Sequence, residues 1–415
     1  MHEMQRKHKV HSLTGRITEK LMKQSFKAVK RNRGAAGIDK VSVKMFEANL
    51  EENLRALMRD LKTGDMKPKP LRRSYIPKDP GNTAFRPLGI PVVRDRVGQE
   101  VLRRLLNPIF EPMFHQWSFG FISGRNCHMA IEQVLEFHTS EGLQVVLDAD
   151  IKGFFDQIPH DVIMASVAAY VADGNILRLV EKFLKAGVME DGVFKPTTVG
   201  TPQGGVVSPL LANIVLNHLD WHLDATGYRF VRYADDFVIA CQTKSGAQEA
   251  LAVVKRVVEE DLRLSLSPEK TSITTYGKGY SFLGYRLSKR SALMRSKSLE
   301  KFKTKVRQLT VRKHNLEAKA IEKLNRVIRG TANYFSASFS TCRWSFQKLD
   351  SWIRMRLRCM KKKRKSRNDN YKLRVVYFRK NLGLLSMEEV FLQRRGLTNQ
   401  TAPRNYGAIS LGVAQ

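Results

Sequence analysis

Two adjacent aspartates between two apolar segments constrain this chain more than any other feature. Asp235 and Asp236 follow the segment Arg229 to Tyr233 and precede the segment Phe237 to Ala240. Such segments predict two buried strands joined by a tight turn, which would hold both carboxylates at the tip of a hairpin. Asp-Asp pairs are also common in ordinary turns, so this pair alone does not establish a function.

A second acidic segment, Val145 to Asp150, has the composition of a buried strand. Side chains two residues apart on a strand point the same way, so Asp148 and Asp150 would share one face. A strand carboxylate beside the hairpin pair would make an oxygen-rich site for two Mg²⁺ ions about 3.5–4 Å apart. Taken alone, the segment is equally compatible with an acid at a turn or helix N-cap.

A glycine-rich segment, Gly200 to Gly205, precedes an apolar helical pattern. Ser208 is a suitable N-cap and Pro209 suits the first helical turn. Glycines at this place would allow a base pair or phosphate to approach closely, although glycine-rich loops before helices are common.

The charge of the chain favours a polyanionic partner. Its 415 residues include 72 Lys and Arg against 39 Asp and Glu, a net charge of +33. Nucleic acid, an anionic membrane or an acidic protein would neutralise such an excess. No apolar run approaches the roughly 18 residues that span a bilayer, and no secretion signal opens the chain, so we expect no membrane partner. The cysteines form no CxxC pair, and we expect a reduced intracellular protein.

Most of the net charge of +33 lies in the segment 286–380, which has 30 Lys and Arg against 5 Asp and Glu, a net of +25. Apolar residues at helical spacing predict amphipathic helices with basic outer faces, and one ends in the run Lys361, Lys362, Lys363, Arg364 and Lys365. Four aromatic residues there could stack on unpaired bases, although we favour a core role for them: Tyr334, Phe335, Trp344 and Trp352.

In order and spacing, these features resemble the reverse transcriptases, and most closely the reverse transcriptase/maturase proteins encoded by bacterial and organellar group II introns. The resemblance runs from about Arg31 to Gly396. It rests on Asn32 to Asp39, Ile76 to Lys78, Arg86 to Pro91, Ser118 to Arg125, the Asp150 strand, the Gln203 loop, the Tyr233 turn and Phe282 to Tyr285.

The resemblance implies an α+β right-hand polymerase with fingers, a palm built on an antiparallel sheet, and an α-helical thumb/maturase domain. We expect an N-terminal extension over 1–70, fingers and palm over 71–285, the thumb/maturase domain over 286–380 and a tail over 381–415. Within the first 285 residues, the sequence pattern predicts a helix over about 42–61 and a strand pair around the turn Asp79 to Asn82.

The resemblance also assigns the site. Asp150 rather than Asp148 becomes a metal ligand and catalytic residue, together with Asp235, Asp236 and, as a further metal ligand, Ile151. The residues implied to bind the deoxynucleoside triphosphate are Lys78, Arg86, Phe155, Gln203 and Lys270, with Phe155 excluding a 2′-hydroxyl. Those implied to lie against template and primer are Gly204, Tyr233, Phe282, Leu283, Gly284 and Tyr285. Lys361 to Lys365 would bind RNA.

The expected activity is RNA-directed DNA synthesis with two Mg²⁺ ions, an RNA template and a DNA primer. The expected second role is to bind group II intron RNA for splicing and mobility, in a bacterial cytoplasm or nucleoid. A domesticated relative with a repair or defence role, and a splicing factor without polymerase activity, are the alternatives. Many intron proteins end in a nuclease domain with His and Cys ligands. No His or Cys follows Leu385, so we expect none here.

Overall fold

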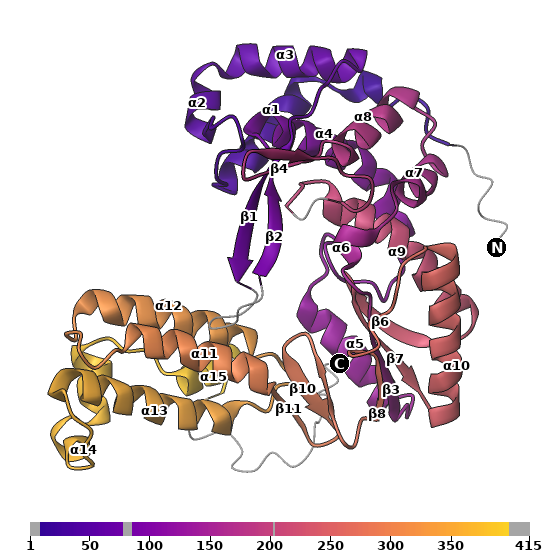
Figure 1. Ribbon diagram of the computed structural model, residues 1–415. Coiled ribbons are helices and arrows are strands. Elements are labelled where there is room, and N and C mark those ends of the chain that lie inside the picture. The colour runs from indigo at the N-terminus through magenta and orange to yellow at the C-terminus, as the bar shows by residue number, and fades with distance from the viewer. Residues whose placement is uncertain (1–8, 78–84, 202–203, 398–415) are drawn as a thin grey trace. The chain divides into compact units, whose positions relative to one another are not determined.

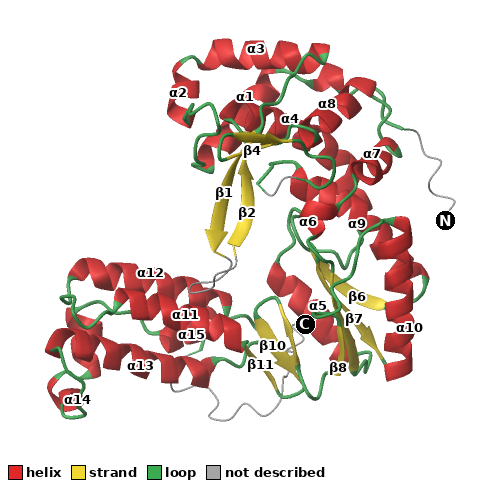
Figure 2. Ribbon diagram, in the orientation of Figure 1, coloured by secondary structure: helices red, strands yellow, loops and turns green. Residues whose placement is uncertain are grey.

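The computed structural model describes residues 9–77, 85–201 and 204–397 in two compact units. Unit 1 contains the described residues up to 273, and unit 2 contains residues 274–397. Figure 1 labels the helices and strands, and Figure 2 distinguishes them by colour. The two units are described separately below.

Unit 1 combines helices with two mixed or antiparallel sheets. Its N-terminal half contains η2 (Thr14–Arg16), α1 (Glu19–Arg31), α2 (Val43–Ala48), α3 (Leu50–Thr63), β1 (Leu71–Pro77), β2 (Phe85–Ile90), α4 (Val93–Phe110), η3 (Glu111–Met113) and α5 (Cys127–Thr139). Its C-terminal half contains β3 (Val145–Asp150), α6 (Phe154–Gln157), α7 (His160–Ala168), α8 (Gly174–Leu184), β4 (Val188–Glu190), β5 (Val193–Lys195), α9 (Ser208–Ala225), β6 (Arg229–Tyr233), β7 (Asp236–Cys241), α10 (Lys244–Lys255), η4 (Arg256–Asp261) and β8 (Ser272–Thr275).

One four-stranded sheet has the order β6-β7-β3-β8. The strands β3 and β7 are antiparallel, and so are β6 and β7. Their centres are buried because they consist of Val, Leu, Ile and Phe, which suit a pleated surface covered by other elements. Helices α5, α9 and α10 pack against this sheet. The strands predicted around Asp150 and around Asp235 are therefore confirmed.

The other sheet of unit 1 has the order β2-β1-β4-β5. The predicted antiparallel pair is present as β1 and β2, while the turn expected at Asp79 to Asn82 lies outside the described residues. The helix expected over 42–61 is instead two helices, α2 and α3, because the backbone at Asn49 leaves helical geometry (φ −119°, ψ 46°).

The N-terminal segment is not a separate body. Helix α1 packs against α3 and α4, and its buried face includes Met22, Phe26 and Val29. The segment before α1 is tied down by Asp173, whose carboxylate accepts the Leu13 and Thr14 N–H groups at 2.9 and 2.7 Å. Residues 9–70 thus belong to unit 1.

Unit 2 begins with a small antiparallel sheet followed by helices. Its elements are β9 (Tyr280–Phe282), β10 (Tyr285–Ser288), β11 (Ser291–Met294), α11 (Ser296–Leu309), α12 (Ala318–Tyr334), α13 (Arg343–Lys362), α14 (Asp369–Lys372), η5 (Tyr377–Asn381) and α15 (Met387–Arg394). Helix α15 packs against α12 and α13, and buried Asp350 accepts the Met387 N–H at 2.9 Å. The segment expected as a tail therefore contributes to this unit at least through α15.

The division between units falls at residue 273, ahead of the boundary expected at 285. The sheet β9 to β11 lies with the helices because Tyr285 packs on Phe335 and Phe339 from the helical region. Among the described residues, none of the helices has the length and apolar character to cross a bilayer.

Candidate active site on the four-stranded sheet

Three carboxylates meet where β3 ends and the β6–β7 turn begins. Asp150, the last residue of β3, is the register partner of Asp236, the first residue of β7. Asp235 precedes Asp236 in the turn. Asp148 is opposite Val238 instead, which places it about 7 Å further along the strand from the turn. The register thus brings together Asp150, Asp235 and Asp236 and leaves Asp148 one strand repeat away.

The surroundings of Asp235 disfavour its negative charge. Burial raises the pKa of Asp235, and the negative charge of Asp150 raises it further. The positive charges of Arg86 and Lys270 act in the opposite direction. Lys270 Nζ lies 2.7 Å from Asp150 Oδ2. A cation is therefore favoured at this place, and all the side-chain donors are oxygens, as hard divalent cations require.

Ile151 follows β3 and forms an isolated antiparallel bridge with Leu266. The two hydrogen bonds of this bridge run from the Lys152 N–H to the Ser265 oxygen and from the Ser267 N–H to the Asp150 oxygen, each 2.8 Å. Ile151 and Leu266 are thus a non-hydrogen-bonded pair, and the bridge does not use the carbonyl oxygen of Ile151. The Ile151 side chain is buried, so only this carbonyl could serve as a ligand.

The turn that carries Asp235 is anchored by a buried arginine. Ala234 has φ 60°, in the left-handed region that costs free energy for any residue except glycine. Arg232, fully buried on β6, donates from its NH1 group to the Ala234 oxygen at 2.9 Å. The same NH1 group donates to Asn213 Oδ1 of α9 at 2.9 Å, and Nε donates to Asp220 Oδ1 of α9 at 2.7 Å.

A second support comes from the segment before α5. The Phe119 N–H donates to the Arg232 oxygen at 2.8 Å, and Asn213 Nδ2 donates to the Gly120 oxygen at 2.7 Å. A Cβ at Gly120 would lie 2.3 Å from the Ala234 nitrogen. The turn therefore fits against a glycine, and no other residue could occupy this position without moving it.

The described residues of the glycine-rich segment contact α6 and β2. The Thr201 N–H donates to the Phe155 oxygen at 2.7 Å, and a Cβ at Gly204 would lie 2.4 Å from the Gly89 oxygen of β2. Phe155 is half-buried, whereas its neighbour Phe154 is in the core. Helix α9 begins at Ser208 rather than after it, because Val207 holds the N-cap position; Pro209 is in the first turn as expected.

Two residues expected at the nucleotide site, Lys78 and Gln203, lie outside the described residues. Arg86 is exposed on β2, where it pairs in register with Ile76. Tyr233, the last residue of β6, is half-buried and pairs in register with Asp236.

The Phe282 to Tyr285 segment is in unit 2. The side chains of Phe282 and Tyr285 are buried, and Tyr285 Oη donates to the Tyr334 oxygen at 2.7 Å. Leu283 and Gly284 form the turn between β9 and β10, both with positive φ. A primer contact by this segment would therefore be made by the turn and not by the two aromatic rings.

The basic run occupies the end of α13. All five residues from Lys361 to Lys365 are exposed. Lys363 ends the helix with φ 56°, and its ammonium donates to the His314 oxygen at 2.6 Å. Lys361 lies 4.3 Å from the Tyr377 ring centroid, and Arg364 pairs with Asp369 at 3.6 Å. Lys362 and Lys365 make no hydrogen bond or ion pair with the rest of the described chain.

The aromatic residues of unit 2 divide between the two roles considered. Phe335 is buried and Tyr334 packs against it, as a core role predicts. Trp344 is 66% exposed, with Lys348 Nζ 3.2 Å from its ring centroid. Trp352 lies beneath the guanidinium of Arg307.

Sequence reasoning missed Arg232, Asn213 and Asp220. Asn213 and Asp220 are seven residues apart on the face of α9 that also carries the apolar residues of the helix. The sequence signal was the presence of polar residues on an apolar helical face, together with an arginine within a buried strand. Buried polar groups require hydrogen-bond partners, so such residues are expected to contact one another.

Comparison with known proteins gives two family matches. Residues 76–287 match the family described as reverse transcriptase (RNA-dependent DNA polymerase), and residues 299–378 match the group II intron, maturase-specific domain. The chain is 34% identical to Protein YkfC of Escherichia coli (strain K12), over 60% of this chain and 75% of that protein. It is 31% identical to the group II intron-encoded protein LtrA of Lactococcus lactis subsp. cremoris, over 60% of this chain and 52% of that protein.

The chain thus spans about half the length of LtrA. Among solved structures, a Candida albicans telomerase matches with 13% identity and a TM-score of 0.43, covering 77% of this chain and 64% of that chain.

Proposed function

Because the chain belongs to the reverse transcriptase (RNA-dependent DNA polymerase) family and carries a group II intron maturase-specific domain, we propose that it synthesises DNA on an RNA template and binds structured intron RNA. The observation that carries the catalytic half is the register of β3 and β7, which sets Asp150 opposite Asp236 beside Asp235. The observation that supports the RNA-binding half is the net charge of +25 over residues 286–380.

Asp150, Asp235, Asp236 and the Ile151 carbonyl would hold two Mg²⁺ ions. The fit is supported by the all-oxygen donor set and by the raised pKa of Asp235, which reflects its burial and the like charge of Asp150. When bound, such ions promote attack of a primer 3′-hydroxyl and stabilise the leaving pyrophosphate.

The cationic side chains near the carboxylates suit a triphosphate. Arg86 and Lys270 both act electrostatically on Asp235, and their positive charges would attract the phosphates of a nucleotide bound there. Arginine binds phosphate oxygens in pairs, whereas lysine acts as a mobile point charge. We assign Lys78 and Gln203 to the same nucleotide by resemblance.

Phe155 would set the choice of sugar. Its ring is half-buried and packs on the core ring of Phe154, with centroids 5.4 Å apart, which restricts its position. A fixed ring under the sugar would exclude a 2′-hydroxyl by contact. In unit 1, Gly204 and Tyr233 are assigned to template–primer contact by resemblance. In unit 2, the same resemblance assigns such a contact to the Leu283–Gly284 turn.

Intron RNA binding is assigned to the basic helices of unit 2. Lys362 and Lys365 are exposed without a partner in the described chain and can neutralise phosphates directly. Lys361, Lys363 and Arg364 also make contacts within the unit, so they combine a structural role with a phosphate contact.

Primer extension on poly(rA)/oligo(dT) in Mg²⁺ tests the catalytic half. Asp150→Asn and Asp235→Asn should each lower the rate by several orders of magnitude, because a lost ligand removes an ion and not merely one hydrogen bond. Asp148→Asn is the matched control, on the same strand and two residues away, and should cost far less. Equal losses at Asp148 and Asp150 would refute the assignment, and a wild-type chain that cannot extend the primer would refute the polymerase itself.

A further inference from the structure

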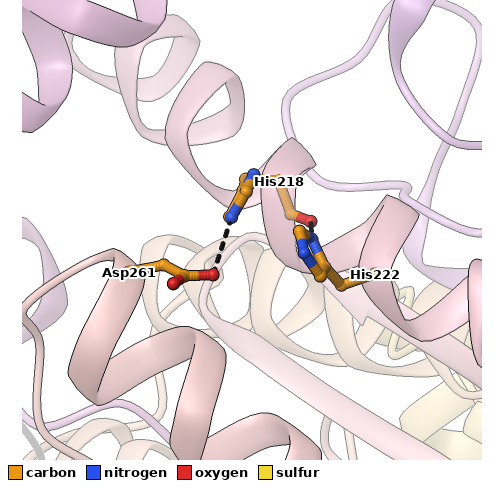
Figure 3. A group of neighbouring side chains, drawn as sticks. All are labelled: His218, His222 and Asp261. Atoms are coloured by element: carbon orange, nitrogen blue, oxygen red, sulfur yellow. Dashed lines mark hydrogen bonds and ion pairs between the residues drawn. The ribbon is translucent and has the colours of Figure 1, made fainter. Parts of the chain in front are cut away.

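A cluster of two histidines and one aspartate lies on unit 1 apart from the three catalytic carboxylates. His218 and His222 come from α9 and Asp261 from the end of η4, and Figure 3 shows the three side chains turned toward one another. One ligand atom from each lies within 4.8 Å of the other two. His218 Nε2 is 3.0 Å from Asp261 Oδ2, and the two imidazole centroids are 4.2 Å apart.

The local backbone explains how the cluster forms. Residues four apart on an α-helix share one face, so His218 and His222 stack on the outside of α9. The intervening Asp220 is fully buried and binds Arg232, which fixes the rotation of the helix. Asp261 ends a π-helical segment in which the Leu262 N–H donates to the Val257 oxygen at 3.0 Å. Such π-turns are rare and concentrate at functional sites.

A hydrogen bond also sets the tautomer of His222. Its Nδ1 lies 2.9 Å from the His218 carbonyl oxygen. A carbonyl can only accept, so Nδ1 carries the proton and Nε2 keeps a lone pair. Histidines that bind metals usually donate their second ring nitrogen to a carbonyl or carboxylate in this way.

We propose that His218, His222 and Asp261 bind a divalent transition-metal ion of the Zn²⁺ class, with water completing the coordination. Two imidazoles and one carboxylate form a ligand set that suits Zn²⁺, whereas Mg²⁺ prefers oxygen ligands alone. Ligands at about 2.0–2.1 Å from a tetrahedral ion lie roughly 3.3 Å from one another. The His218–Asp261 contact is near this value already.

The ligand atoms, which lie up to 4.8 Å apart, can move closer together. The side chains of His218 and Asp261 are 41% and 42% exposed, so rotations about their χ angles can shorten this distance without disturbing the core. The ion would join α9 to η4, two elements that pack against each other. It would differ from the catalytic ions in ligand chemistry and in the strands and helices that hold it.

Zinc binding by the untagged full-length chain tests the proposal. Competition against a chromogenic chelator, in excess Mg²⁺, should reveal one Zn²⁺ equivalent that is lost or weakened by at least about 100-fold in His218→Ala and His222→Ala, since even outer-shell changes cost roughly 10- to 100-fold. His314→Ala, which removes an exposed histidine of unit 2, is the matched control and should bind as wild type. An Asp235→Asn background separates any Zn²⁺ held by the catalytic carboxylates.

Two further measurements keep the test independent of folding defects. Asp261→Asn preserves the shape of the side chain and should weaken Zn²⁺ binding, whereas Asp261→His should retain it with a third imidazole. Co²⁺ in the wild-type chain should give visible absorption typical of a four-coordinate site, absent from His222→Ala. If both histidine variants bind Zn²⁺ with the stoichiometry and affinity of His314→Ala, the cluster is not a metal site.

Discussion

The buried pair of Arg232 and Asp220 allows support of the Asp235–Asp236 turn to be separated from stability of the fold. Removing one partner of a buried pair leaves an uncompensated charge and costs about 3–5 kcal/mol. Asp220→Leu alone should therefore lower the unfolding free energy by that amount, because both side chains are almost completely buried. Replacing both, as Arg232→Met with Asp220→Leu, should restore most of this loss, since apolar replacement of buried pairs is often neutral.

The double variant should recover its stability but not its catalytic activity. In the double variant, the Ala234 oxygen loses a charged donor at 2.9 Å, and Asn213 loses the same partner. A hydrogen bond from a charged group contributes about 1.5–3 kcal/mol. A loss of about 2 kcal/mol from positioning of the turn corresponds to roughly a 30-fold lower kcat. The KM for the nucleotide should change little, because Arg232 lies beneath the turn and not at its surface.

The assay compares two measurements on the same preparations. Chemical denaturation gives the unfolding free energy, and primer extension gives kcat and KM. The matched control is Arg94→Met with Asp60→Leu, a partly buried pair that joins α4 to α3. It should leave kcat near wild type. If the Arg232 and Asp220 double variant is stable and extends primers at the wild-type kcat, Arg232 does not support the turn.

Three other outcomes are expected. Phe155→Val should raise ribonucleotide incorporation relative to deoxyribonucleotide incorporation in single-nucleotide addition, and unchanged discrimination would return Phe155 to a packing role. Lys362→Glu with Lys365→Glu should weaken RNA binding and flatten its salt dependence by roughly one unit of slope per lost phosphate contact. At low salt this variant should still extend a bound primer. A loss of primer extension equal to the loss of RNA binding would contradict the separation of the two activities. Burial raises the pKa of Asp95 to about 6. Protonated Asp95 therefore contributes fully to the stability of the fold below about pH 4, and this contribution is lost as the pH rises through 6. Asp95→Asn should therefore raise the unfolding free energy at pH 7.5 by up to about 3 kcal/mol, with no gain at pH 4; a gain that does not depend on pH would refute the reasoning.

The acidic strands could be predicted because their pattern is local. An apolar segment that ends in Asp150, and two that flank Asp235, show their strand character over five or six residues. The register that sets Asp150 opposite Asp236 could not be obtained this way, because it joins residues far apart in the chain. Resemblance to a family chose Asp150 over Asp148, and the register is consistent with that choice.

Burial was the harder property to predict. The Phe282 to Tyr285 segment matched a family motif, but sequence does not reveal that Tyr285 packs against Phe335 and Phe339 in the segment between α12 and α13. In the same way, Lys363 belongs to a basic run, yet its ammonium caps a neighbouring loop at the His314 oxygen. Both cases depend on tertiary partners that no local pattern encodes.

The contact of Lys270 with Asp150 has a consequence for how the site fills. At 2.7 Å, the ammonium is a counter-ion that a metal ion binding at Asp150 would have to displace. A displaced Lys270 would be free to contact a triphosphate, so binding of the cation would also provide a hydrogen-bond donor for the nucleotide. Coupling of this kind is reciprocal, so each ligand should strengthen the binding of the other. Lys270→Ala should reduce this coupling: the cation alone would bind more tightly, and the nucleotide would increase the affinity for the cation by a smaller factor than in the wild type.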